Sequence, residues 1–177
     1  MTNYKSLLGG ITTIILDVDG VLTDSTVQVT TDGELLRTMN IKDGYALAQA
    51  VKAGYRVCII SGGKNDGVRK RLEGLGVHEI YMGVGYKLDV LNTFLLEHKI
   101  ADHEFVYMGD DIPDVPALQR AGVAACPQDA VPEVKAVCNY ISHVDGGRGA
   151  VRDVIRQVMM VQNKWQVTPV KNAVSSD

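Results

Sequence analysis

The stretch Ile-Leu-Asp-Val-Asp-Gly-Val-Leu-Thr-Asp, residues 15–24, places two carboxylates two positions apart directly after an apolar run. Ending a buried strand with two like charges costs stability unless a cation or a reaction needs them there. The pattern therefore indicates that Asp17 and Asp19 are catalytic or bind a metal, with a simple polar turn as the alternative. An EF-hand calcium loop does not fit, because Leu22 stands where that loop needs Gly and Gln28 where it needs Glu.

Apolar strand-like runs alternate with helical segments along the rest of the chain. We expect strands at 11–17, 55–60, 78–82 and 104–108, and weaker ones at 123–126 and 139–142. Helices are expected at about 43–53, 65–74, 86–98, 114–121 and 148–162, with Gly54, Gly76 and Gly122 where helices would end. The alternation predicts an α/β fold: a Rossmann-like, doubly wound, mainly parallel sheet with helices on both faces.

A β-hairpin interrupts this alternation. Residues 27–30 and 34–39 read as two strands around an Asp-Gly turn, which defines a hairpin insertion at about 26–40. A lone hairpin is marginal in water, so we expect it to pack against something, such as another subunit. The polar residues 166–177 are expected to form a C-terminal tail on one domain of residues 1–165.

Composition narrows the function classes. The 177 residues are 46% hydrophobic with a net charge of −3, which suits one globular domain and gives no electrostatic reason to expect nucleic acid or an anionic membrane. No apolar stretch approaches the roughly 20 residues that span a bilayer. We expect a cytoplasmic protein, because no secretory signal is visible and the three cysteines form no CxxC motif.

A second carboxylate cluster, Gly-Asp-Asp-Ile-Pro-Asp at residues 109–114, follows the strand expected at 104–108. One Asp with a nearby Pro would suffice to begin a helix. Three carboxylates in five positions repel one another without a cation, and hard oxygen ligands favour Mg²⁺. Because ligands collect at the carboxyl ends of parallel strands, we expect Asp110 to lie near Asp17.

Two weaker signals stand at other predicted strand and helix ends. Ser61-Gly62-Gly63 offers a hydroxyl and amides for an anion, although a serine cap is an equal alternative. Lys87 opens a helix, where its charge opposes the helix dipole unless a phosphate offsets it. Taken alone, such a residue is more often a solvated surface lysine.

The ordered set Asp17-x-Asp19, Ser61, Lys87 and Gly109-Asp110-Asp111-x-x-Asp114 resembles the signature of the haloacid dehalogenase (HAD) superfamily of phosphatases. Within it the chain is most similar to the 3-deoxy-D-manno-octulosonate 8-phosphate (KDO 8-phosphate) phosphatase family, through residues 17–24, the hairpin, and residues 41–47, 109–114 and 146–153. It departs from the family pattern at Ser25 for Gly, at Asp153 for Glu, and at Ser61-Gly62-Gly63-Lys64 for an SGR-type sequence.

The resemblance implies a Mg²⁺-dependent phosphatase of lipopolysaccharide precursor synthesis that hydrolyses KDO 8-phosphate through an aspartyl-phosphate. It implies that Asp17 attacks phosphorus and that Asp19 protonates the leaving oxygen and then activates water. The implied metal ligands are Asp17, the Asp19 main-chain carbonyl and Asp110, supported by Asp111 and Asp114, while Ser61 and Lys87 hold phosphoryl oxygens. Contacts to the sugar acid are a weaker expectation, and the candidates are Gly62, Lys64, Arg69, Arg71 and Arg148.

The spacing of the motifs leaves no room for a cap domain. The intervals from Asp19 to Ser61 and from Ser61 to Lys87 are 42 and 26 residues, below the roughly 50 residues of a small domain. The site therefore either stays open or is closed by a neighbouring subunit. The resemblance implies a homotetramer in which the hairpin lies at an interface and Arg148 or the tail approaches another subunit's site.

Three other functions remain open on the sequence. The first is a phosphatase for nonulosonate (sialic-acid-type) 9-phosphates, although such relatives tend to carry an acidic residue where Gly63 stands. The second is a receiver-like phosphoacceptor domain, which Asp19 opposes because a general base would shorten the life of a phosphoaspartate. The third is an inactive assembly module, which the intact Asp17, Asp19, Lys87 and Asp110 oppose.

Overall fold

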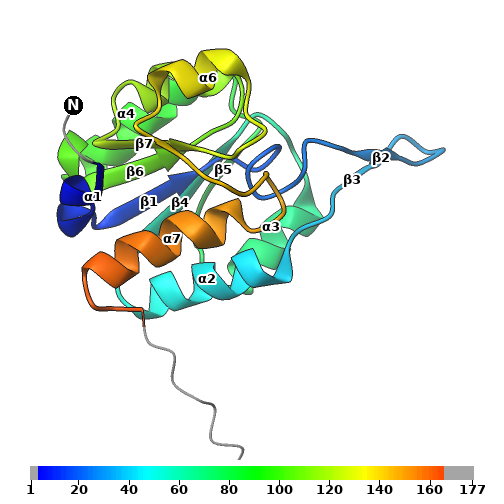
Figure 1. Ribbon diagram of the computed structural model, residues 1–177. Coiled ribbons are helices and arrows are strands. Elements are labelled where there is room, and N and C mark those ends of the chain that lie inside the picture. The colour runs from blue at the N-terminus through cyan, green and yellow to red at the C-terminus, as the bar shows by residue number, and fades with distance from the viewer. Residues whose placement is uncertain (1–3, 166–177) are drawn as a thin grey trace, which may run out of the picture.

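The computed structural model describes residues 4–165, which form a six-stranded sheet between two layers of helices (Figure 1). The strands are β1 (Thr13–Leu16), β2 (Gln28–Val29), β3 (Leu35–Leu36), β4 (Arg56–Ser61), β5 (Glu79–Met82), β6 (Phe105–Met108), β7 (Val123–Cys126) and β8 (Tyr140–Ile141). The α-helices are α1 (Tyr4–Leu7), α2 (Ile41–Lys52), α3 (Asp66–Glu73), α4 (Lys87–His98), α5 (Val115–Leu118), α6 (Pro132–Val137) and α7 (Ala150–Val161). Three short 3₁₀ helices complete the set: η1 (Leu8–Gly10), η2 (Asp102–Glu104) and η3 (Ile112–Asp114).

The main sheet is parallel throughout and has the order β5-β4-β1-β6-β7-β8. The chain builds β4 and β5 on one side of β1 and then β6, β7 and β8 on the other. This places the topological switch point, where ligands bind in such folds, at the carboxyl ends of β1 and β6. The predicted doubly wound α/β fold is confirmed.

Side-chain alternation along β1 explains why helices cover both faces. Ile14 and Leu16 pack into the hydrophobic cluster of α2, α3 and α7, whereas Ile15 packs into the cluster of α4, α5 and α6. All four residues of β1 are buried, which is why this strand reads as a continuous apolar run. Helices cover both faces of β1, and β4 and β6 pair with its two edges. The residues that directly follow β1 therefore start from a fixed position.

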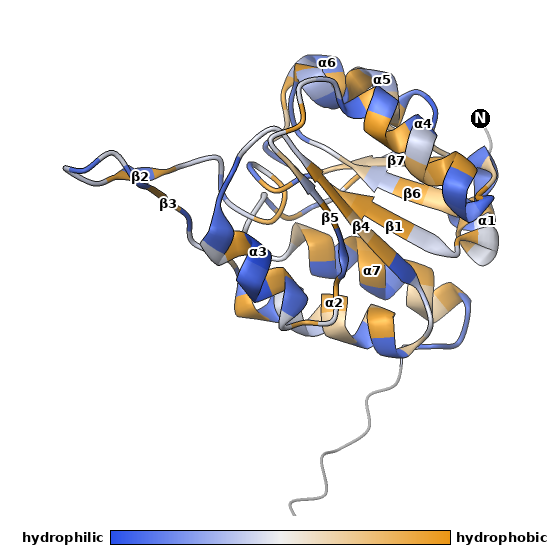
Figure 2. Cartoon of the chain, turned by 180° about the vertical axis from the view of Figure 1, so that it is seen from behind, coloured by the Kyte–Doolittle hydropathy of each residue, from blue (hydrophilic) through white to orange (hydrophobic). Residues whose placement is uncertain are grey.

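The hairpin projects from the body of the molecule (Figures 1 and 2). Its ladder is shorter than predicted: only Gln28 and Val29 pair with Leu36 and Leu35. Twist and the lack of a supporting layer limit an isolated two-stranded ribbon, which explains the shortening. Both strands are exposed and carry apolar side chains, and Val29 reaches 69% exposure.

The expected helix end at Gly54 is confirmed, since this residue adopts φ of +87° next to the C-cap of α2 at Ala53. Gly76 also adopts φ of +87°, but α3 is capped at Gly74, so the helix ends two residues earlier than expected. The expectation for Gly122 is wrong. The helix before it, α5, already ends at Leu118, and the Gly122 N–H donates to the Asp102 carbonyl at 2.7 Å. A Cβ at Gly122 would lie 2.7 Å from that carbonyl oxygen, so close backbone packing is the reason for this glycine.

Two side chains near the start of α2 hold the first turn of α7 and the loop that precedes it. Asn40 caps α2 and also donates to the Gly147 carbonyl at 3.2 Å. The buried Asp43 accepts the Arg152 N–H at 2.7 Å, and burial raises the pKa of this carboxyl. The loop before α7 packs closely against the loop after β1. A Cβ on Gly146 in the first loop would collide with the Gly20 carbonyl in the second.

Candidate active site

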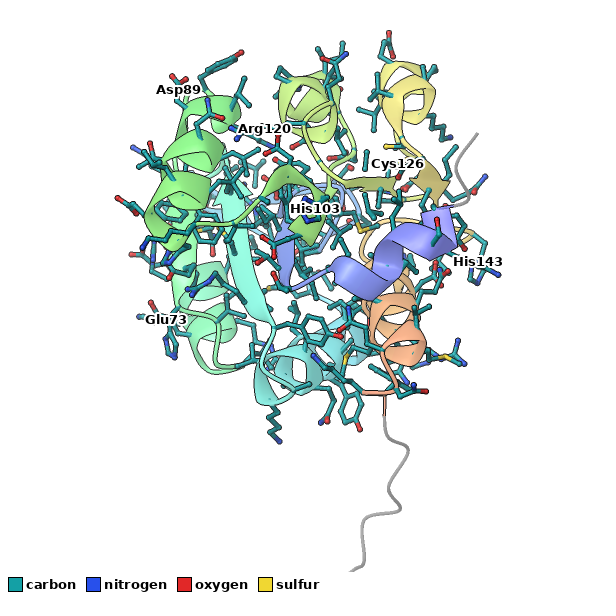
Figure 3. All side chains as sticks on the ribbon, turned by 90° about the vertical axis from the view of Figure 1, so that its left-hand side faces the viewer. Glu73, Asp89, His103, Arg120, Cys126 and His143 are labelled. Carbon is teal, nitrogen blue, oxygen red and sulfur yellow. The ribbon has the colours of Figure 1, made fainter. Side chains whose placement is uncertain are left out.

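The predicted catalytic residues lie together in one cleft of about 570 Å³ at the carboxyl ends of β1, β4 and β6. Asp17 and Asp19 follow β1, Ser61 ends β4, and Asp110 follows β6. The cleft is lined by these four together with Ser25, Gly62, Gly63, Val84, Gly85, Lys87, Asp111, Pro113, Asp114, Asp129 and Val131. The opposite edge of the sheet, seen in Figure 3, carries the turn with His103.

A buried lysine bridges two buried carboxylates at the base of the cleft. Lys87 Nζ lies 2.7 Å from Asp17 Oδ2 and 2.8 Å from Asp114 Oδ1. Tyr107 also donates its hydroxyl to Asp114 Oδ1 at 2.8 Å. Burial by itself would lower the pKa of Lys87, but Asp17 and Asp114 outweigh it and raise the pKa. Lys87 is therefore a fixed cation beside the nucleophile candidate, not a surface lysine.

Asp114 is wholly committed to structural hydrogen bonds. Its Oδ1 accepts from Lys87 and Tyr107, and its Oδ2 accepts the Asp110 N–H at 3.2 Å. The side chain is completely buried. This agrees with the supporting role expected for Asp114, which orients Lys87 and the Asp110 backbone.

The carboxylates of Asp17, Asp110 and Asp114 place one oxygen each within 4.8 Å of one another. Burial first, and then the neighbouring carboxylates, raise the pKa of Asp17 to about 6 and that of Asp110 to about 7. Asp110 Oδ1 is buried and has no hydrogen-bond partner within the described part of the chain. An unpaired buried carboxylate oxygen can act as a ligand for a divalent cation. Mg²⁺ fits this site because it is a hard cation that prefers oxygen ligands.

Without metal, the folded protein should lose stability as the pH rises from about 4 to about 8. Below pH 4 both carboxyls are protonated in the folded and unfolded states. Above their raised folded pKa values, near 6 for Asp17 and 7 for Asp110, the fold must hold both charges in a buried acidic cluster that Lys87 only partly offsets. Thermal melts in a chelator at pH 5 and pH 8 should show this drop, and excess Mg²⁺ should abolish it. Equal melting temperatures at the two pH values in chelator would contradict the prediction.

Asp19 is held by an arginine that the sequence did not single out. Arg37, which follows β3, donates Nε to Asp19 Oδ1 at 2.7 Å and Nη2 to Asp19 Oδ2 at 2.9 Å. The Arg37 side chain is only 6% exposed, whereas that of Asp19 is 39% exposed toward the cleft. A cation in a hairpin gives no sequence signal, because only the fold brings it to the end of β1.

The turn after β4 brings the predicted anion-binding residues Ser61, Gly62 and Gly63 to the cleft. Ser61 is buried, and its Oγ accepts the Gly63 N–H at 3.2 Å. A Cβ on Gly63 would lie 2.9 Å from Asp19 Oδ2 and 3.1 Å from Arg37 Nη2, so glycine leaves room for that ion pair. The serine capping expected as an alternative is not seen in α3, which is capped by Asn65.

The candidate sugar-binding cations are scattered. Lys64 packs its side chain over Gly83, and Arg69 donates to the Ile80 carbonyl at 3.1 Å, so neither lines the cleft. Arg71 lines a separate cavity beneath the hairpin. Arg148 pairs with Asp24 of its own chain at 3.0 Å and is 68% exposed. Of the predicted set only Gly62 lines the cleft itself.

Two further residues, Asp111 and Ser25, line the cleft beside the candidate metal ligand Asp110. Asp111 is exposed, and its side chain accepts the Ile112 N–H at 2.8 Å, which starts η3. Ser25 donates its hydroxyl to Asp110 Oδ2 at 3.4 Å, so the residue that replaces the family's glycine touches a predicted metal ligand. The positive φ of 61° at Ser25 explains why glycine would also fit there.

A parallel α/β domain with paired aspartates after its central strand, a buried lysine and a second carboxylate cluster defines a phosphatase of the HAD superfamily. No protein-family model matches the chain. It is 36% identical over 163 residues to the 3-deoxy-D-manno-octulosonate 8-phosphate phosphatase KdsC of Salmonella typhi, an alignment that covers 92% of this chain and 87% of the relative. The chain belongs to this KDO 8-phosphate phosphatase family.

Solved structures agree with this assignment. One is a 3-deoxy-D-manno-octulosonate 8-phosphate phosphatase from Moraxella catarrhalis in complex with magnesium ion, phosphate ion and KDO, with a TM-score of 0.88, 29% identity and coverage of 92% of this chain and 94% of that one. Another is the cobalt-bound enzyme from Haemophilus influenzae, with a TM-score of 0.85, 27% identity and coverage of 89% and 92%.

Within residues 4–165, no helix is long and apolar enough to cross a membrane.

Proposed function

We propose that this chain hydrolyses KDO 8-phosphate to KDO and phosphate with Mg²⁺ bound, as a step of lipopolysaccharide precursor synthesis. The observation that carries the proposal is the buried contact of Lys87 with Asp17 in the cleft, at 2.7 Å, within a chain of this family. A lysine held beside a nucleophilic carboxylate can neutralise the charge of an incoming phosphate. The Moraxella relative that contains KDO and phosphate supports the same substrate.

In the first half of the reaction, Asp17 is proposed to attack phosphorus. The bond from the Asp17 oxygen to phosphorus forms, the bond from phosphorus to the sugar oxygen breaks, and Asp19 gives its proton to the departing sugar. Lys87 and Ser61 hold phosphoryl oxygens while charge spreads over them. The hydrogen bond of Lys87 to Asp114, at 2.8 Å, keeps the ammonium group in place.

In the second half, Asp19 is proposed to take a proton from water. The water oxygen attacks phosphorus, the bond to Asp17 breaks, and phosphate leaves with Asp17 restored as a carboxylate and Asp19 as an acid. When bound by Asp17, the Asp19 main-chain carbonyl and Asp110, Mg²⁺ supplies positive charge beside the phosphoryl group. Asp111 and Asp114 would support those ligands.

A direct comparison of two sugar phosphates tests the function. In Mg²⁺, kcat/KM for KDO 8-phosphate should exceed that for a nonulosonate 9-phosphate, and excess chelator should stop both reactions. A higher value for the nonulosonate would favour the sialic-acid-type alternative. A single burst of phosphate without turnover would instead favour the receiver-like alternative, and no reaction at all would favour an inactive assembly module.

We also propose a homotetramer in the cytoplasm, without nucleic-acid or membrane partners. The projecting hairpin exposes Val27, Val29, Leu35 and Leu36, which a neighbouring subunit would cover. The cysteines Cys58, Cys126 and Cys138 are free thiols, in keeping with a reducing compartment. Arg148 is exposed enough to approach another subunit, and the proposed role of the tail lies outside the described residues. Sedimentation of an active monomer would contradict the tetramer.

A further inference from the structure

The ion pair of Arg37 and Asp19 lies on the border between two cavities. Asp19 lines the catalytic cleft, whereas Arg37 lines a second cavity of about 530 Å³ between the hairpin and α3. The residues that line the second cavity include no carboxylate, and among them Gln28, Thr38 and Asn65 offer polar groups. A phosphate ester bound in the cleft that extends toward this cavity has to pass the ion pair.

The ion pair also engages Asp19, which is the proposed proton donor. Both oxygens of Asp19 accept charge-assisted hydrogen bonds from Arg37, at 2.7 and 2.9 Å. A protonated Asp19 could still accept hydrogen bonds, but without its negative charge it would hold Arg37 much more weakly, because both bonds would lose their charge assistance. An Arg37 that keeps both contacts at full strength holds Asp19 as a carboxylate with no proton to give, so protonation of the departing sugar requires Arg37 to loosen its hold.

Arg37 cannot simply be left without a partner. Its side chain is 6% exposed, and its only other hydrogen bond among the described residues is from Nη1 to the Leu35 carbonyl at 3.0 Å. A buried guanidinium that loses its carboxylate is costly, so a replacement anion would make the exchange favourable. In the proposed reaction the leaving oxygen would lie one hydrogen bond from Asp19. Arg37, one hydrogen bond from Asp19 as well, would then lie at most about two hydrogen-bond lengths, roughly 6 Å, from the leaving oxygen.

We propose that Arg37 is a specificity-determining residue that leaves Asp19 for the carboxylate of a sugar-acid phosphate. This rests on the proposed function, in which the substrate carries a carboxylate at the end of its carbon chain opposite the phosphate. A sugar phosphate without a carboxylate offers Arg37 no new partner, so Asp19 stays engaged and the ester is cleaved slowly. The ion pair thus selects substrates with a second negative charge.

The test compares substrates with and without a carboxylate on Arg37→Met. The substrates are KDO 8-phosphate and glucose 6-phosphate, which both release a primary alcohol. In the variant, kcat/KM for KDO 8-phosphate should fall about 10- to 100-fold, whereas that for glucose 6-phosphate should stay unchanged or rise. The ratio of kcat/KM for KDO 8-phosphate to kcat/KM for glucose 6-phosphate should therefore fall by at least about 10-fold. An unchanged ratio would overturn the inference.

Controls separate this inference from the proposed function. Arg56→Met removes an arginine paired with Glu79 at the amino end of β4 and should leave the preference unchanged. p-Nitrophenyl phosphate has no carboxylate and its leaving group needs no proton, so its kcat/KM should change far less in Arg37→Met than that of KDO 8-phosphate. Equal losses on all three substrates would overturn the inference, because they would mean that Arg37 only supports the fold. If Arg37→Met does not fold, Arg37→Gln, which also removes the charge but keeps a polar side chain, provides the same comparison. A wild type that ignores KDO 8-phosphate would refute the proposed function instead.

Discussion

Asp17→Asn is expected to lower kcat by about 10⁴-fold or more, because an amide cannot act as the nucleophile. The protein should remain folded. In the metal-free protein the Asp17 carboxyl has its pKa raised to about 6, mainly by burial, so the fold gains nothing from its charge at pH 8. Asparagine keeps the shape of the side chain and removes that charge from beside Asp114.

The measurement for Asp17→Asn is steady-state phosphate release at pH 8 with Mg²⁺, together with a thermal melt in chelator. Asp102→Asn is the matched control. Asp102 lies in η2, before β6, and pairs with Arg120 at 2.9 Å, so its loss should leave kcat unchanged. Substantial hydrolysis by Asp17→Asn would rule out nucleophilic attack by Asp17.

Lys87→Met should cost both activity and stability. It leaves Asp17 and Asp114 buried without their shared cation, a change that typically costs about 3–5 kcal/mol of unfolding free energy. The Lys87 contacts are 2.7 and 2.8 Å, and its side chain is 8% exposed, so little solvent screens them. We expect kcat to fall about 10³-fold, since the cation beside the phosphoryl group is lost.

Urea denaturation at pH 8 in chelator measures the stability loss of Lys87→Met. The double variant Lys87→Met with Asp114→Asn should recover much of the unfolding free energy, because it removes one of the two orphaned charges, but it should not recover kcat. Equal stability of Lys87→Met and the wild type would show that the buried bridge contributes nothing to the fold. Recovery of kcat in the double variant would show that Lys87 does not act on the substrate.

Much of the fold could be predicted from local patterns. The strands β1, β4, β5 and β6 fall within one or two residues of the expected ranges, because each is a short apolar run that ends at glycine or a polar residue. Helix α6, with six residues, was not expected, since it is too short to show a helical period. The ladder of the hairpin was overestimated, because strand propensity says little about a ribbon that has no sheet to support it.

The candidate site divides in the same way. Asp17 and Asp110 could be predicted because each carboxylate stands where an apolar strand ends. Ser61 and Lys87 are weak signals by position alone and could be predicted only through the ordered set of motifs and its family resemblance. Arg37 and Tyr107 could not. Tyr107 lies in a fully buried strand and reads as core packing, although its hydroxyl reaches Asp114 at 2.8 Å. Arg37 acts through a contact made by tertiary structure, and nothing in the sequence around it indicates Asp19 as its partner.

The central position of β1 in the sheet bears on how a newly made chain becomes an enzyme. The ribosome synthesises Thr13–Leu16 early, yet this strand pairs with β4 and with β6, which ends at Met108. The loop after β1 also packs closely against Gly146, which is synthesised much later than β1. Long-range pairing of this kind forms slowly and leaves apolar strands uncovered in the meantime. A nascent polypeptide released before that glycine emerges would hold every proposed catalytic carboxylate and still lack the segment that packs against Gly20 and Thr23, in the loop that carries the first two of them.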